Sequence, residues 1–317
     1  MDERALYETL LNEPSIKDST RAVYVRHLEK LTHEIMVRKG RVIPLDTIIE
    51  RPLDVERALS NMRPHAQDLY VASIVALLHH TGARRERPEL YAEWCNLKRK
   101  IRGPIEEKYL SNAPDPRQKK AWVTFEELLS ARSAADSRGD YSQDALLLWM
   151  YTAIAPVRGD YYRCVVERVT SEAAADRAVS RAREHGNNAF VLGRGRVASR
   201  TVLTDYKTSR TYGTLVTPVP ADLAAAVRLS LQQSPRDHLF VDSKGLPFTS
   251  RNSFTKWANR VLRARLGNDT VSLTTLRHVF ISRRDLALET KTGRERNAVA
   301  RAMGHGNATQ DRYNFRR

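Results

Sequence analysis

The feature that most constrains the fold is a short polar segment about a third of the way along the chain. Residues 111–120, SNAPDPRQKK, hold two prolines and show no apolar periodicity, which is typical of a boundary between domains. The length of 317 residues also agrees with about two domains. We therefore predict a first domain over residues 1–112, a linker over residues 113–118 and a second domain over residues 119–317.

The first domain carries helical signals throughout. Apolar residues recur at helical spacing over 15–35, with Val23 on the predicted buried face and Asp18, Ser19 or Thr20 as candidate caps. Three further helices are predicted over residues 54–62, 66–80 and 88–102. The first domain is therefore predicted to be a helical bundle.

Basic residues of this domain form two groups. Lys17, Arg21 and Arg26 are predicted to lie on the outer face of the first long helix, and Lys98, Arg99 and Lys100 form the densest basic run of the chain. Such residues can bind a phosphate backbone, although a solvated helix face is an equally good explanation. The second group also fits a localisation signal, for which it is weak support.

The net charge favours a polyanionic partner. Lys and Arg number 53 against 37 Asp and Glu, which leaves +16 and a pI of about 10.1. Nucleic acid fits this charge better than a membrane, because no apolar run approaches the roughly 20 residues of a spanning helix. The acidic N-terminus lacks a signal-peptide core, so we expect an intracellular protein, in the cytoplasm or the nucleus, that is not secreted.

Motifs for cofactors and metals are missing from the sequence. Two cysteines, Cys95 and Cys164, are too few for a zinc cluster, and we expect both to be reduced and buried. The pair His79 and His80 has no acidic or cysteine neighbour at ligand spacing, and no GxxxxGK[ST] run is present. We therefore predict no metal, no ATP and no small-molecule cofactor.

The second domain combines helices with a small sheet. Thr124 and Glu127 form a capping box, and the most apolar helix, over 141–155, ends at Pro156 just before Arg158. Three more helices are predicted over residues 173–185, 223–231 and 250–266. Strands are predicted over residues 163–169, 189–192 and 238–241, with a hairpin formed by residues 201–207 and 213–219 and Lys207 near its tip. The predicted fold is mainly α with a small β-sheet.

The C-terminal run 272–313 places reactive side chains close together in sequence. One predicted helix, over 276–288, carries Arg277, and a second, with Val299 and Met303 one turn apart, leads into His305. Gly304 and Gly306 flank this histidine and should end the helix. Tyr313 follows eight residues later.

These residues together suit chemistry on a phosphodiester. Two arginines, Arg158 and Arg277, can hold the non-bridging oxygens and stabilise the charge of the transition state. Tyr313 offers a phenol nucleophile, His305 can move its proton or bind the phosphate, and Lys207 could protonate the departing sugar oxygen. Each residue taken alone is better explained as an ordinary surface or core side chain.

The order Arg158, Lys207, Arg277, His305, Tyr313, in the contexts PVRGDY, TTLRH, MGHG and DRY, resembles the tyrosine recombinases, also called phage-type integrases. The N-terminal SIKDSTRAVYVRHLEKL is similar to the core-binding domain of that family. Thr274 stands where the family usually has His or Lys, and His278 could partly compensate as an auxiliary residue. PVRGDY resembles recombinases of large eukaryotic DNA viruses and mobile elements.

The resemblance implies a helical core-binding domain and an α+β catalytic domain that cleaves double-stranded DNA. The implied intermediate is a 3′-phosphotyrosine, formed without ATP or metal, in a homotetramer assembled on DNA. Two alternatives stay open. One is a type IB topoisomerase, which uses a related residue set, and the other is a catalytically impaired DNA-binding protein on the same scaffold, which Thr274 makes conceivable.

Overall fold

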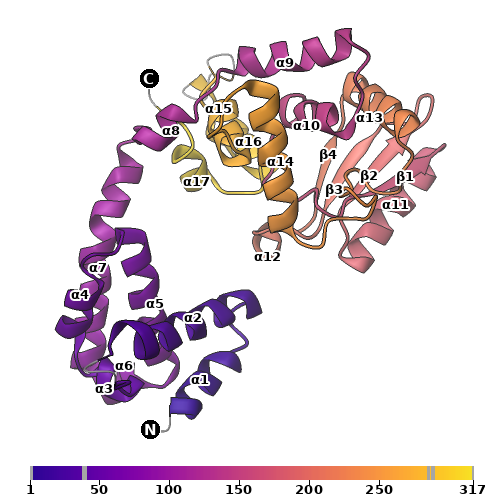
Figure 1. The fold of residues 1–317 in the computed structure, drawn as a ribbon. Helices are drawn as coiled ribbons and strands as arrows, with labels where there is room; N and C mark the ends of the chain where they lie inside the picture. The colour runs from indigo at the N-terminus through magenta and orange to yellow at the C-terminus, as the bar shows by residue number, and fades with distance from the viewer. Residues whose placement is uncertain (1–2, 38–40, 284–285, 287–289, 316–317) are drawn as a thin grey trace. The chain divides into compact units, whose positions relative to one another are not determined.

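The structure is a computed structural model that describes residues 3–37, 41–283, 286 and 290–315. The chain divides into two compact units, Met1–Ser111 and Asn112–Arg317 (Figure 1). The division falls within the polar segment that the sequence singles out. Each unit has a hydrophobic core of its own.

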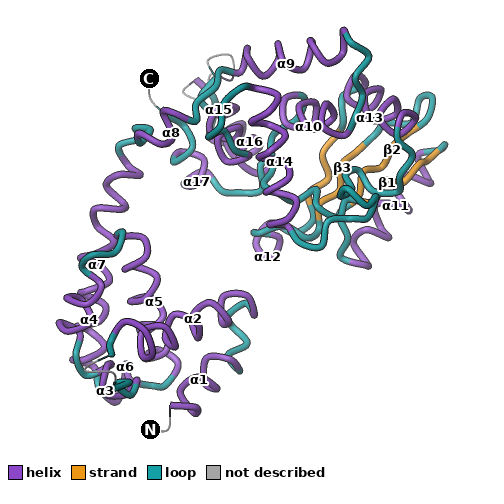
Figure 2. Tube along the Cα trace, in the orientation of Figure 1, coloured by secondary structure: helices purple, strands orange, loops and turns teal. Residues whose placement is uncertain are grey.

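The named elements of the first unit, over its described residues, are all helices joined by loops (Figure 2). Leu28, Ile74 and Leu77 are fully buried in its core, and the Trp94 indole N–H donates to the carbonyl of Ile49 at 2.9 Å. The elements are α1 (Glu3–Leu11), α2 (Asp18–Lys30), a π-helical turn η1 (Leu31–Ile35), α3 (Leu45–Ile49), α4 (Pro52–Leu59), α5 (Pro64–His80), α6 (Ala83–Glu86) and α7 (Pro88–Leu110).

Some local predictions in this unit are wrong. The N-cap of α2 is Lys17, which makes no side-chain cap, and Val23 is 38% exposed because the core-facing stripe of α2 passes beside it. Helix α7 runs past residue 102 to Leu110 and contains Pro104, since burial of Ile101 and Ile105 keeps that stretch packed.

The second unit starts with the short helix α8 and continues into the predicted capping box. Glu127 N–H donates to Thr124 Oγ1 at 3.1 Å, and Thr124 N–H donates to Glu127 Oε2 at 2.6 Å, which confirms that prediction. The elements are α8 (Pro116–Lys120), α9 (Phe125–Ser137), α10 (Gln143–Thr152), β1 (Val165–Val169), α11 (Glu172–His185), β2 (Ala189–Gly193), β3 (Arg200–Leu203), α12 (Ser209–Tyr212), β4 (Leu215–Pro218), α13 (Ala221–Gln233), α14 (Arg251–Leu266), α15 (Leu273–Ile281), α16 (Gly293–Ala302) and α17 (Asn307–Asp311).

Strands β1 to β4 form one mixed sheet in sequence order. Strand β1 pairs parallel with β2 through the α11 crossover, whereas β2–β3 and β3–β4 are antiparallel. Ala189 and Val191 of β2 face the small cluster under α11, while Phe190 and Leu192 point into the main core, as the alternation of a strand requires. The predicted fold class, mainly α with a small sheet, is confirmed.

The predicted strand over 238–241 is wrong. His238 makes a single bridge to Val165, and Leu239 N–H donates to the carbonyl of Cys164 at 2.7 Å. The segment therefore contacts the edge of β1 at this point without forming a strand. Leu239 and Phe240 are fully buried because they pack into the core, which explains why their apolar pattern suggests a strand.

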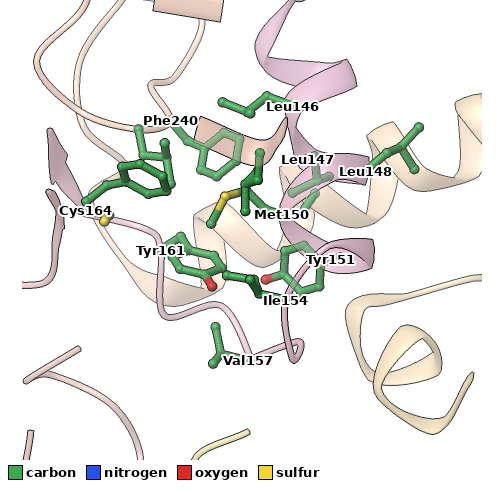
Figure 3. Close-up of a cluster of buried hydrophobic side chains, with 14 of the residues drawn as sticks. Leu146, Leu147, Leu148, Met150, Tyr151, Ile154, Val157, Tyr161, Cys164 and Phe240 are labelled. Carbon is green, nitrogen blue, oxygen red and sulfur yellow. The ribbon is translucent and has the colours of Figure 1, made fainter. Parts of the chain in front are cut away.

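Helix α10 lies at the centre of the main core, as its apolar sequence predicts. Leu147, Leu148 and Met150 are fully buried (Figure 3). The Tyr151 hydroxyl, at the end of the helix, donates to the carbonyl of Arg158 at 2.6 Å. The segment after α10 is thereby tied to a rigid element.

Candidate active site

Arg158 follows α10 and is held mainly through its backbone. Its N–H donates to the buried Asp160 Oδ2 at 3.1 Å, while its carbonyl accepts from Tyr151. Gly159 has no room for a side chain, because a Cβ there would lie 2.6 Å from Thr255 Oγ1. The loop is thus fixed and its guanidinium points toward Tyr313, with Nη2 3.4 Å from the phenol oxygen.

Arg277 projects from α15 and is 1% exposed. Its Nη1 donates to the carbonyls of Pro156 at 2.8 Å and Met303 at 3.2 Å, which links the Arg158 segment to the His305 segment. Nε and Nη2 make no hydrogen bond of ordinary geometry to a described residue, while the Tyr313 phenol interacts with the guanidinium through charge and hydrogen bonding. Burial lowers the pKa of this arginine, and the two remaining nitrogens are available to an anion.

His305 lies just beyond the end of α16. Its N–H donates to the carbonyl of Ala300 at 3.0 Å, and Gly304 has a φ of +68°, so the predicted glycine break is confirmed. The imidazole Nδ1 lies 3.1 Å from the Gly306 carbonyl, which can only accept, so Nδ1 carries the proton. Burial and the charge of Arg277 lower the pKa of His305 to about 4, which leaves Nε2 with an open lone pair.

Tyr313 is surrounded by the two arginines and His305. The Arg277 guanidinium lies 4.9 Å from the phenol ring centre, and the His305 ring stacks on the phenol with centres 5.5 Å apart. Burial acts to raise the pKa of Tyr313, but the charges of Arg277 and Arg158 outweigh it, and the pKa falls below its ordinary value. The phenol is thus closer to its nucleophilic form.

Lys207 is exposed in the connection between β3 and β4, which form the predicted hairpin. The short helix α12 occupies part of that connection. The neighbouring Thr208 Oγ1 donates to the Gly304 carbonyl at 2.5 Å, and a Cβ on Gly306 would lie 2.6 Å from the Tyr212 hydroxyl. The lysine-bearing loop therefore packs directly against the His305 turn.

The two auxiliary residues behave differently. His278 Nδ1 lies 3.1 Å from the Tyr313 carbonyl, and its ring stacks on Phe315 with centres 4.2 Å apart, so it docks the backbone that carries the tyrosine. Thr274 is exposed and lines a pocket of about 180 Å³ together with Arg117 and Arg263. These two arginines place positive charge in the pocket that the neutral side chain of Thr274 lines.

The predicted DNA-binding residues lie on α7 and on α2 together with its N-cap residue, Lys17. Arg26 and Arg99 are exposed. Arg21 is folded back instead, because it pairs with Asp18 and donates to the Glu13 carbonyl at 2.8 Å, so the expected exposure is wrong. Lys100 pairs with Glu56 at 2.6 Å. The two remaining positions, Lys17 and Lys98, are half-buried.

The described residues contain no group of three or more side chains that could hold a metal ion. His80 pairs with Glu13 at 3.1 Å, a partner that its sequence neighbours do not suggest. Of the helices in the described ranges, none has both the length and the hydropathy needed to cross a bilayer.

Taken together, the second unit brings Arg158, Arg277 and His305 around Tyr313. Sequence reasoning missed Asp160, whose only local signal is a carboxylate two residues after an arginine that leaves a buried helix. Burial raises the pKa of Asp160, against the opposing charges of Arg251, Arg277 and Arg158. The site can position an anion beside a phenol.

Comparison with known proteins finds no family model and no curated protein that matches the chain. Among solved structures, the chain is similar to one described as "Crystal structure of XerA recombinase", with 13% sequence identity and a TM-score of 0.40. The match covers 100% of this chain and 94% of that one.

Proposed function

We propose that this protein is a site-specific DNA recombinase in which Tyr313 cleaves a strand by attacking a phosphodiester. The observation that carries the proposal is a partly buried phenol whose oxygen lies 3.4 Å from Arg158, with Arg277 4.9 Å from its ring. Two permanent cations beside a phenol both bind the phosphate and favour the phenolate.

In the proposed step, Tyr313 Oη forms a bond to phosphorus as the bond from phosphorus to O5′ breaks. Nε2 of His305, whose lone pair is open, receives the phenol proton as the Oη–P bond forms and passes it to solvent, because an imidazole with a pKa of about 4 does not hold a proton near neutral pH. O5′ leaves with the bonding electron pair and accepts a proton from Lys207 Nζ. The product is a 3′-phosphotyrosine and a free 5′-hydroxyl, and attack by another 5′-hydroxyl reverses the step on a new strand.

Double-stranded DNA is the proposed partner, since the chain carries a net charge of +16. Exposed basic residues such as Arg26 and Arg99 would contact its backbone. We propose a homotetramer on DNA, located inside the cell where DNA is present. The chemistry uses only side chains and therefore calls for no metal or nucleotide cofactor.

The test is covalent trapping. A DNA duplex from a randomised library, with a nick just downstream of the scissile position, loses the short fragment after cleavage and leaves the protein attached. Wild type should form an adduct that Tyr313→Phe abolishes while DNA affinity is kept. If neither protein forms the adduct and both bind equally, a DNA-binding module is the better explanation.

A plasmid assay separates recombination from topoisomerase activity. A recombinase acts on paired target sites, so a supercoiled plasmid without such sites should stay supercoiled. Relaxation of any plasmid by the monomer would favour the type IB topoisomerase. Both enzymes would form the same adduct, so the two assays are read together.

A further inference from the structure

The segments that carry Arg158 and Lys207 are joined by side chains that neither motif contains. Asn188, just before β2, is 4% exposed. Its Nδ2 donates to the carbonyls of Asp160 at 2.7 Å and Asp205 at 2.8 Å. Its Oδ1 accepts from the N–H groups of Thr204 at 2.8 Å and Asp205 at 2.9 Å.

Every hydrogen-bonding position of this carboxamide is therefore filled. A primary amide has two donor hydrogens and two acceptor lone pairs, and all four are used on backbone groups. A buried amide with this many bonds resists displacement, because each lost bond leaves a buried polar group unsatisfied. Asn188 thus holds both segments at a fixed separation.

Arg251 of α14 makes a second link between the same segments. Its Nη2 lies 3.2 Å from both the carbonyl and Oδ1 of Asp205, and its Nε lies 3.1 Å from Asp160 Oδ1. The Tyr162 hydroxyl adds a bond to Asp205 Oδ2 at 2.9 Å. We call Asn188 and Arg251 the clasp.

The linked positions lie two residues from the reactive ones. Asp160 is two residues after Arg158, and Asp205 is two residues before Lys207. Because Ala189 pairs with Val202, Asn188 lies level with the end of β3, where the lysine-bearing connection starts. The clasp can therefore fix the position of the segment that carries Lys207 relative to Arg158.

We propose that Asn188 is a positioning residue that holds Lys207 where it can protonate the leaving oxygen of a phosphate bound by Arg158. This inference rests on the proposed function. It assigns no chemistry to Asn188 itself. The proton passes from Lys207 Nζ to O5′ as the P–O5′ bond breaks, and Asn188 acts only through the backbone at Asp205.

The test uses DNA in which sulfur replaces O5′ at the scissile linkage. A thiolate is a good leaving group, with a thiol pKa of about 8.5, so it departs without a proton donor. Lys207→Ala should slow single-turnover cleavage of ordinary DNA by roughly 10²-fold and leave sulfur DNA almost unaffected. Asn188→Ala should slow single-turnover cleavage of ordinary DNA by roughly tenfold or more. On the sulfur-substituted DNA, its cleavage rate should be close to that of wild type.

The matched control is Ser199→Ala. Ser199 is also buried, 5% exposed, and its Oγ accepts from the Gly193 N–H at 3.0 Å, at the opposite end of β2. Ser199→Ala also loses a buried hydrogen bond. Its ratio of the cleavage rate on sulfur-substituted DNA to that on ordinary DNA should nevertheless equal the wild-type ratio. Thermal unfolding of each variant reports whether it folds.

The outcomes separate the two proposals. If Asn188→Ala lowers the cleavage rate equally on both DNAs, Asn188 has a general role in stability and the inference is overturned. The proposed recombinase function is not affected by that result. Absence of any wild-type adduct on either DNA would instead defeat the proposed function. If Asn188→Ala does not fold, Arg251→Gln, which breaks the second link to Asp205, is judged by the same ratio.

Discussion

Acid should destabilise the second unit through two buried histidines of the candidate site. His278 and His305 are 7% and 2% exposed, and burial lowers the pKa of each from 6.5 to about 4. Tyr313, Arg277 and Asp115 face His278, while Arg277, Arg158 and Tyr313 face His305. Cations beside both rings oppose a further positive charge.

The direction in which pH changes the free energy of unfolding follows from proton binding. Between the folded and the unfolded pKa, the unfolded chain binds more protons, so the free energy of unfolding falls as pH falls. The contribution is complete above the unfolded pKa of 6.5 and is lost as pH approaches about 4. Each histidine should account for about 2 kcal/mol between about pH 7 and about pH 5.

Urea unfolding followed by tryptophan fluorescence measures this loss, because Trp122, Trp149 and Trp257 all lie in the second unit. His278→Asn and His305→Asn should each reduce the drop between the two pH values by about 2 kcal/mol. An asparagine at 278 can still donate to the Tyr313 carbonyl. A drop that is the same in wild type and both variants would refute the reasoning.

Three further outcomes are expected. Gly159→Ala should destabilise the second unit by about 1–3 kcal/mol in urea unfolding, because its Cβ would lie 2.6 Å from Thr255 Oγ1, and Thr255→Ala should restore part of the loss; no restoration would contradict the contact. Arg158→Ala and Arg277→Ala should each remove most adduct formation but keep DNA affinity in a band-shift assay, and near-normal cleavage by either would contradict the phosphate role. Arg26→Ala should lower the slope of log affinity against log salt by about 1, and an unchanged slope would place Arg26 outside the interface.

Local patterns in the sequence predict much of the secondary structure. The apolar run of α10, the Thr124–Glu127 capping box and the glycine break before His305 all follow from interactions within a few residues. Such interactions depend on helical spacing and backbone geometry, which a sequence displays directly. The order of the reactive residues is likewise visible in the chain, although the order alone does not show that they meet.

Tertiary structure decided which side chains meet and which are buried. Arg158 and Tyr313 are 155 positions apart in sequence, and α15 connects their segments, since its Arg277 donates to the carbonyl of Pro156 and its His278 contacts the carbonyl of Tyr313. Asn188 has no local signal at all, since its four partners lie on two other segments. The segment 238–241 has a local pattern that misleads, because long-range packing outweighs weak local preference when the two compete.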